Sequence, residues 1–345
     1  MKRAVTVILT LVLIAACLAG CGNKTGDSTA NSRGGFALTG KDISSDKVQI
    51  AFIPMSTAGQ VNVIVQQAAD KIMDTYPNIA INFFDAGFDP NTQITLINEC
   101  ITQKYDAIVM ECVDATALAP VIKEAEDAGV VVITSNMGCD AIHTLHIESD
   151  SYQGGWVSGE ALIKMLGGKG KILLIDVPAP IAVTTTFCKG FEDYSESFPD
   201  VEILEYVNLG FDAMGQEGAY NMMRDLLTKY DEINAVYTPD DNFALGVIQA
   251  INEAGRKGEG ILVWGTEIQP GGIEAVLSGE LTGSCWTDRY GSLYNAFSYA
   301  VYFAQTGINS KALGYSKTPS IFSGFVAVTR DNIEDILPLT RWPGY

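Results

Sequence analysis

Short apolar runs rich in β-branched residues alternate with amphipathic stretches over most of this chain, and this alternation constrains its fold more than any other feature. Four such runs precede residue 140, at 47–54, 79–84, 107–110 and 130–134. Each is followed by a polar turn and then by apolar residues that recur every three or four positions, as in a helix. Continuous apolar strands are typical of parallel sheets buried on both faces, and strict alternation implies right-handed crossovers. We therefore expect an α/β protein with a doubly wound, Rossmann-like architecture.

The strand–helix pattern restarts near Asp150, which predicts a second lobe of the same kind. A strand over 144–150 closes the first series, and a second series runs from Gly154 to Trp286. The remaining residues supply one long helix and one final strand over 320–328, too little for a third domain. They must complete the first two lobes. The chain is therefore expected to cross between the lobes more than once, through a hinge of several strands.

The N-terminus predicts export and lipid attachment. Lys2 and Arg3 precede an apolar run at 5–13, which is short for a membrane span and typical of a signal peptide. The run leads into Leu18-Ala19-Gly20-Cys21, which looks like a lipobox, where the cysteine is lipid-modified and becomes the first mature residue. An ordinary secretory signal with an accidental cysteine is the alternative.

Accordingly, residues 1–20 are expected to be a signal peptide and residues 21–46 a lipidated, flexible tether, because the tether has little to bury. This predicts a location on the extracytoplasmic face of a bacterial cell membrane, periplasmic where an outer membrane exists. The membrane would be contacted through the lipid on Cys21 alone.

Charge and side-chain chemistry exclude several classes of protein. A formal net charge of −19 argues against nucleic-acid binding, because phosphates would be repelled. The only histidines, His143 and His146, are expected on one strand with their rings on opposite faces, so no metal site is predicted. No phosphate-binding loop or catalytic signature occurs, and no cofactor is expected.

Five cysteines follow Cys21, and this odd number at wide spacings does not form a disulfide framework. Each is expected to be a small buried apolar residue. A bridge between Cys100 and Cys112 is left open.

The stretch from Ala235 to Gly246 carries the most chemistry. It predicts a short strand ended by Pro239, followed by Asp240 and Asp241 at the start of a helix. Carboxylates in that position can cap the helix by accepting from free N–H groups. Ligands of open α/β sheets, however, bind outside the carboxyl ends of the strands, so the same carboxylates can bind a compound rich in hydroxyls or amines. Both interpretations stay open.

With these residues in place, the body of the chain, 47–336, resembles a periplasmic sugar-binding protein of the ribose-binding family, the solute receptor of an ABC importer. The segments that carry the resemblance are Val132-Ile133-Thr134-Ser135-Asn136, Ile147-Glu148-Ser149-Asp150, Gly154-Gly155, Gly159-Glu160, Lys189-Gly190-Phe191, Asp240-Asp241-Asn242-Phe243-Ala244-Leu245-Gly246 and Gly265-Thr266-Glu267. The resemblance implies the periplasmic-binding-protein type I fold: two doubly wound lobes joined by a three-strand hinge, with a ligand held between them.

The family pattern also implies lobe limits on this chain. They are 47–149 plus 287–319 for the N-terminal lobe, 150–286 plus 320–330 for the C-terminal lobe, a tail at 331–345, and crossings near 149–150, 286–288 and 320–324.

Carried over position by position, the resemblance implies a set of ligand-binding residues. They are Gln60, Asn62, Asn136, Phe211, Asp240, Glu267 and Trp286. For Trp286 the alternative is hinge packing, and for Glu267 it is helix capping.

The chain departs from the family at three of its ligand-binding positions. No aromatic residue stands in the first turn, Asn136-Met137 replaces an Asp-Arg pair, and Thr185-Thr186-Phe187 occupies the region of a second arginine. Arginine makes forked bonds to planar or negative groups, so its loss disfavours an acidic ligand. A neutral sugar or similar polyhydroxy compound is expected, with a small amine as the alternative.

Three functions compete at this point. The first is a lipid-anchored, monomeric receptor that delivers a sugar-like ligand to ABC permease subunits. The second is a sensory receptor of the same fold that signals to a membrane kinase or chemoreceptor. The third, an enzyme that cleaves glycosides with Asp240 and Glu267 as paired carboxylates, is not favoured, since a fold alone carries no activity.

Overall fold

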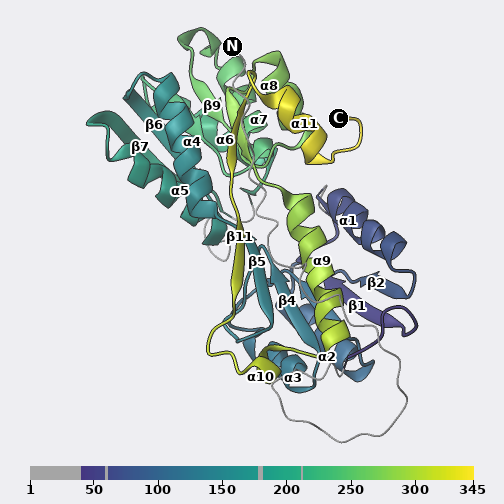
Figure 1. The fold of residues 1–345 in the computed structure, drawn as a ribbon. Coiled ribbons are helices and arrows are strands. Elements are labelled where there is room, and N and C mark those ends of the chain that lie inside the picture. Colours follow the sequence, from purple (N-terminus) through teal and green to yellow (C-terminus); the bar gives the residue numbers. More distant parts are fainter. Residues whose placement is uncertain (1–39, 59–60, 178–181, 211–212) are drawn as a thin grey trace, which may run out of the picture. The chain divides into compact units, whose positions relative to one another are not determined.

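The computed structural model describes residues 40–58, 61–177, 182–210 and 213–345 (Figure 1). The expected signal peptide and most of the expected tether lie outside these residues. Within them the chain forms two six-stranded sheets, each with helices on both faces. None of the helices in these ranges is long and apolar enough to cross a bilayer.

The first lobe has the strand order β11-β5-β4-β3-β1-β2, with every neighbouring pair parallel. Its strands are β1 (Val48–Ile53), β2 (Ile79–Phe83), β3 (Ala107–Met110), β4 (Val131–Ser135), β5 (Leu145–Ser149) and β11 (Ser320–Ser323). Its helices are α1 (Asn62–Thr75), α2 (Pro90–Thr102), α3 (Ala119–Asp127), α9 (Arg289–Thr306) and α10 (Ser310–Leu313).

The second lobe repeats this arrangement with the strand order β12-β10-β9-β8-β6-β7, in which only β12 is antiparallel to its neighbour. Its strands are β6 (Lys169–Asp176), β7 (Asp200–Asn208), β8 (Ala235–Tyr237), β9 (Leu262–Trp264), β10 (Gly283–Trp286) and β12 (Val326–Thr329). Its helices are α4 (Ser151–Met165), α5 (Ala182–Ser195), α6 (Gln216–Lys229), α7 (Asp241–Glu253), α8 (Pro270–Ser278) and α11 (Ile333–Thr340), with a short 3₁₀ turn at Lys257–Glu259.

Successive residues of each central strand serve two separate cores, as the alternation of side chains along a strand requires. In β1, Ile50 and Phe52 pack with α1 and α9, whereas Ala51 and Ile53 pack with α2 and α3. The central strands are thus covered by helices on both faces, which explains why their sequences are continuous apolar runs.

Glycines set the distance between α4 and α5 on one face of the second sheet. A Cβ at Gly155 would lie 1.8 Å from the carbonyl oxygen of Phe187, and one at Gly190 would lie 2.0 Å from that of Tyr152. Both glycines belong to segments that carry the family resemblance. Their physical role is to let the two helix backbones touch.

The chain passes between the two sheets three times, after β5, after β10 and after β11 (Figure 1). Each crossing brings one hydroxyl to a common point: Ser149, Thr287 and Ser323 lie pairwise 3.2 Å apart, oxygen to oxygen. The predicted fold, two doubly wound lobes joined by a three-strand hinge, is confirmed.

The predicted final strand over 320–328 is wrong in one respect, because it is two strands in different sheets. β11 pairs in parallel with β5 of the first lobe, and β12 pairs antiparallel with β10 of the second. Between them, Phe325 is held by Gln153 of α4, whose side chain accepts from the Phe325 N–H (2.6 Å) and donates to its carbonyl (3.2 Å). Residues 320–323, assigned from sequence to the C-terminal lobe, therefore hydrogen-bond to the first sheet. The other lobe limits remain predictions.

The predicted tail at 331–345 contains α11, which packs on α8 and β12. Trp342 follows the helix, is buried, and donates from its indole nitrogen to the carbonyl of Ile268 (2.8 Å). The end of the chain thus belongs to the core of the second lobe.

Candidate ligand-binding cleft

A cavity of about 620 Å³ opens where the chain first crosses between the sheets. One wall consists of the loops after β3 and β4, at 112–115 and 136–140, and of the end of β5. The other wall is the start of α4, at 150–152, with Val183 and Thr186 of α5. The position agrees with the rule that ligands of parallel sheets bind outside the carboxyl ends of the strands.

The cavity is acidic. Its charged lining residues in the described part of the chain are Asp114, Asp140, Glu148 and Asp150, and neither lysine nor arginine is among them. Ionised carboxylates only accept hydrogen bonds, so the wall favours a ligand that donates them. Phe322 of β11 adds an exposed aromatic face, which the sequence analysis did not predict.

A chain of hydrogen bonds behind the wall positions Glu148. His143 donates from Nδ1 to the carbonyl of Ala141 (2.8 Å), so its Nε2 must accept from the hydroxyl of Thr134 (2.7 Å). That hydroxyl has no second proton, and it therefore accepts from Nδ1 of His146 (2.7 Å). His146 Nε2 lies 3.0 Å from a carboxylate oxygen of Glu148, which completes the chain of contacts from His143 to the cavity wall.

These contacts overturn the prediction that the two histidine rings lie on opposite faces of a strand. β5 begins only at Leu145, so His143 lies in the turn before it, and the two ring centres are 6.5 Å apart. Burial lowers the pKa of His143 to about 4, which keeps that ring neutral. Across the described ranges, no group of three or more His, Cys, Asp or Glu could hold a metal ion.

Among the predicted binding residues that the structure describes, Asn136 alone lines this cavity. It follows β4 with a φ of 59°, in the left-handed region that asparagine tolerates better than most residues. Its N–H donates to the carbonyl of Ile147 (2.9 Å), which fixes the turn and leaves the side-chain amide at the cavity wall.

Asp240 and Glu267 lie near each other in the second lobe, after β8 and β9, but neither lines this cavity. Asp240 caps α7 by accepting from the N–H of Asn242 (2.7 Å), and it also accepts from the amide of Gln269 (2.6 Å). Burial, and then the charge of Glu267, raise the pKa of Asp240 to about 6. The capping interpretation of Asp240 is therefore confirmed, and a role in ligand binding stays a prediction.

Asp241 is fully buried beside this pair and serves the fold. Its carboxylate accepts from the N–H of Gln269 (2.8 Å) and from the hydroxyl of Ser284 (2.7 Å), which join α7, α8 and β10. Burial, and then the charge of Asp240, raise the pKa of Asp241 well above its ordinary value.

An ion pair that the sequence analysis missed stands at the end of β3. Arg289 donates to the buried carboxylate of Glu111 (2.7 Å). Burial raises the pKa of Glu111. The charge of Arg289 lowers this pKa, and the charge of Glu267 raises it further. No pattern in the sequence could have indicated this pair, because its members are 178 residues apart.

The remaining predicted residues are placed as follows. Trp286 ends β10 and is partly buried against the core of the second lobe, as the hinge-packing alternative requires. Asn62 is the first residue of α1, and its side-chain amide donates to the carbonyl of Ser56 (3.3 Å). Gln60, Phe211 and Cys21 lie outside the described residues.

The Cys100–Cys112 bridge that the sequence left open is absent: all five cysteines in the described part of the chain are free. Cys100 packs in the core under β1 and β3. Cys112 instead faces Cys139 at the cavity wall.

Two doubly wound lobes, three chain crossings and a cavity at the strand ends define a two-lobed solute-binding protein. The family model described as a periplasmic binding protein domain matches residues 50–307, and the chain belongs to this family. The resemblance to the ribose-binding branch is also confirmed. A ribose import binding protein of Bacillus subtilis is 24% identical over 260 residues, 74% of this chain and 79% of that protein.

Other similar proteins differ in the ligand that their names give. A xylitol-binding protein of Mycolicibacterium smegmatis is 27% identical over 217 residues, and the match spans only 61% of each protein's length. A putative rhizopine-binding protein of Rhizobium meliloti is 24% identical over 279 residues, 79% of this chain and 87% of that protein.

Solved structures share the fold. An ABC transporter solute-binding protein of Bacillus halodurans with bound myo-inositol superposes with a TM-score of 0.72 at 24% identity, over 84% of this chain and 97% of that one. A periplasmic ribose ABC transporter protein of Conexibacter woesei gives a TM-score of 0.74 at 19% identity, over 87% of this chain and 97% of that one. These relatives are solute-binding proteins of transporters rather than enzymes.

Proposed function

We propose that this chain is a lipid-anchored extracytoplasmic receptor that binds a neutral sugar or similar polyhydroxy compound and delivers it to the permease of an ABC importer. The observation that carries the proposal is the acidic cavity, which bears Asn136 and Glu148 at the ends of two adjacent parallel strands. Such a wall accepts hydrogen bonds from many hydroxyls at once.

The names of the similar proteins support this class of ligand. Xylitol, ribose and myo-inositol, the compounds named with three of them, are all neutral and rich in hydroxyls. The binding set proposed for this chain is Gln60, Asn62, Asn136, Phe211, Asp240, Glu267 and Trp286, with Glu148 and Phe322 added from the cavity lining. No enzymatic role is proposed.

A small amine is the second candidate, because the cavity wall carries four carboxylates and neither lysine nor arginine among the described lining residues. The negative potential of these carboxylates would attract a protonated amine. The sensory role differs from transport in the membrane partner and not in the ligand site.

Thermal unfolding in the presence of candidate ligands tests the proposal. Pentoses, hexoses, polyols, nucleosides and small amines would each be added to the purified chain. A ligand at a hundredfold over its dissociation constant should stabilise the protein by about 2.7 kcal/mol. Stabilisation by a neutral polyol supports the first candidate, stabilisation by amines alone supports the second, and no shift with any compound contradicts both.

Lipid attachment is tested separately. The wild-type precursor should be recovered with membranes and should incorporate labelled fatty acid, whereas Cys21→Ala should do neither. Labelling of the variant would contradict anchoring through Cys21.

A further inference from the structure

Two of the five free cysteines in the described residues stand apart from the others, because both line the cavity. Burial raises the pKa of Cys100 and Cys285 to about 12 and also raises that of Cys188, which makes these three thiols unreactive at neutral pH. Cys112 and Cys139, in contrast, both line the cavity.

The backbone holds the two thiols in contact. Cys112 follows β3 and Cys139 lies in the loop after β4, the neighbouring parallel strand. The N–H of Cys112 donates to the carbonyl of Met137 (3.3 Å), which ties the two loops together. The two thiols lie close enough to perturb each other's pKa.

The two sulfurs are not equivalent. Cys112 is 1% exposed, whereas Cys139 is partly exposed to the cavity. The sulfur of Cys139 accepts from the N–H of Ala141 (3.4 Å), and its thiol donates to the carbonyl of Ala115 (3.2 Å). The neighbouring Cys112 thiol lowers the pKa of Cys139, burial opposes this, and the Ala141 N–H adds to the lowering, whereas the Cys139 thiol and burial raise the pKa of Cys112. An accessible, activated thiol backed by a buried partner is the arrangement of a thiol–disulfide exchange pair.

We propose that Cys139 and Cys112 form a thiol–disulfide exchange site that reacts with small neutral or cationic disulfides entering the cavity. The Cys139 thiolate attacks one sulfur of the disulfide R–S–S–R. The S–S bond breaks, a Cys139–S–S–R bond forms, and RS⁻ leaves with the electron pair and takes up a proton.

Cys112 then resolves the mixed disulfide. It attacks the Cys139 sulfur and passes its proton to the departing sulfur of R, so that the Cys139–S–S–R bond breaks, a Cys112–Cys139 bond forms and a second RSH leaves. The two protein thiols are oxidised, and the small disulfide is reduced to two RSH.

The charge of the cavity sets the preference among disulfides. Asp114, Asp140, Glu148 and Asp150 share the lining with the two cysteines, and no lysine or arginine is among the described lining residues. An anionic disulfide such as oxidised glutathione is repelled by this field, whereas cystamine, a dication, is attracted. The inference depends on the sulfurs and the cavity, and not on the proposed transport function.

The test treats the full-length chain with cystamine at neutral pH, quenches with iodoacetamide and maps each cysteine peptide by mass spectrometry. The expected product is a Cys112–Cys139 cross-linked peptide, while Cys100, Cys188 and Cys285 are alkylated only after unfolding. Oxidised glutathione at the same concentration should react at least threefold more slowly in low salt, and the difference should shrink as salt screens the charges. Equal reactivity of Cys100, Cys112, Cys139, Cys188 and Cys285 in the folded chain would overturn the proposal.

Two variants separate the roles of the sulfurs. In Cys112→Ser the reaction should stop at a stable mixed disulfide on Cys139. In Cys139→Ser, Cys112 should remain unmodified over the same time. Modification of Cys112 in the second variant at the wild-type rate would also overturn the proposal. If either variant fails to fold, the wild-type time course, compared with the same chain in urea, still decides whether Cys139 reacts selectively.

Discussion

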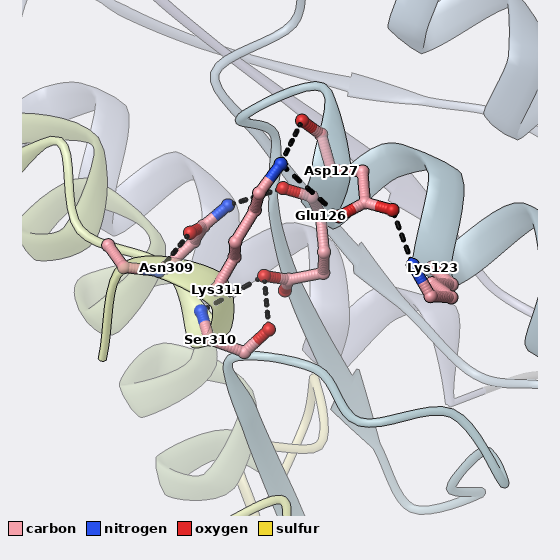
Figure 2. Close-up of polar contacts among 7 residues, drawn as sticks. Lys123, Glu126, Asp127, Asn309, Ser310 and Lys311 are labelled. Carbon is pink, nitrogen blue, oxygen red and sulfur yellow. Dashed lines mark hydrogen bonds and ion pairs between the residues drawn. The ribbon is translucent and has the colours of Figure 1, made fainter. Parts of the chain in front are cut away.

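The carboxylate of Glu126 on α3 accepts two hydrogen bonds from Ser310 on α10, one from its backbone N–H (3.0 Å) and one from its hydroxyl (2.7 Å) (Figure 2). The other carboxylate oxygen accepts from the N–H of Val132 (3.0 Å) and from the N–H (2.8 Å) and hydroxyl (2.7 Å) of Thr144. A single buried side chain thus connects the strand that precedes the Asn136 turn to Ser310, which lies 184 residues after Glu126.

Glu126→Gln should destabilise the protein. Both carboxylate oxygens of Glu126 accept hydrogen bonds, and in glutamine one of them is replaced by an amide nitrogen, which donates and would face donors. We expect a loss of about 1–3 kcal/mol in the free energy of unfolding, measured by urea denaturation. The matched control is Asp127→Asn on the same helix, where the exposed carboxylate pairs only with Lys123 and Lys311 (Figure 2). That change should alter stability by less than about 1 kcal/mol. Equal losses in the two variants would contradict the assignment.

Gly155→Ala should separate α4 from α5, since the new Cβ would lie 1.8 Å from a backbone oxygen. Overpacking of this kind typically costs about 1–3 kcal/mol, and we expect a lowered melting temperature. Gly258→Ala is the control, because no atom lies within 4 Å of its Cβ position and its backbone is unstrained. A melting temperature unchanged by Gly155→Ala would show that the helices do not touch there.

Local sequence patterns predicted the repeated lobes well, because each buried strand is apolar on both faces and each helix has a clear periodicity. Gly155 and Gly190 could even be singled out as part of the family resemblance, although only the structure shows the backbone contact that requires them. In these cases the signal lies within a few residues of the element.

Predictions failed where a distant partner decides the outcome. The strand over 320–328 splits because β5 and β10 each pair with one half of it, and His143 leaves the strand to bond Thr134 and Ala141. The Glu111–Arg289 pair and the contact between Cys112 and Cys139 also join segments that are remote in sequence. Residue types alone indicated the acidic character of the site but not which carboxylates line the cavity.

Asp241→Asn should stabilise the protein increasingly as the pH rises. The pKa of Asp241 is raised in the folded state, so the folded chain holds its proton more tightly than the unfolded chain does. Wild-type stability from this group is therefore greatest below the unfolded pKa near 4 and is lost as the pH rises.

Asparagine keeps both contacts, since its oxygen can accept from the Gln269 N–H and its amide can donate to the Ser284 hydroxyl. Thermal unfolding of both proteins at pH 5 and pH 8 measures the effect. A stability difference that does not grow between these pH values would contradict a strained buried carboxylate.

His143→Gln should reduce the loss of unfolding free energy that the protein shows as the pH falls. The pKa of His143 is lowered to about 4, so its contribution is complete above the unfolded pKa near 6.5 and is lost as the pH falls toward 4. Between pH 7 and pH 5 the wild type should lose about 2 kcal/mol more than the variant. Urea denaturation at both pH values tests this, and parallel losses would mean that the ring is not held neutral.

Binding of a polyhydroxy ligand at the Asn136 wall of the cavity is the central claim, and titration calorimetry of neutral polyols at pH 7 tests it most directly. The variant Asn136→Gly removes the side-chain amide while tolerating the φ of 59°, and Asn98→Ala, an exposed asparagine on α2, is the control. We predict saturable one-to-one binding of at least one neutral polyol by the wild type and the control, and affinity at least tenfold weaker in Asn136→Gly. Wild-type affinity in Asn136→Gly, or heat from no polyol at all, would contradict the account.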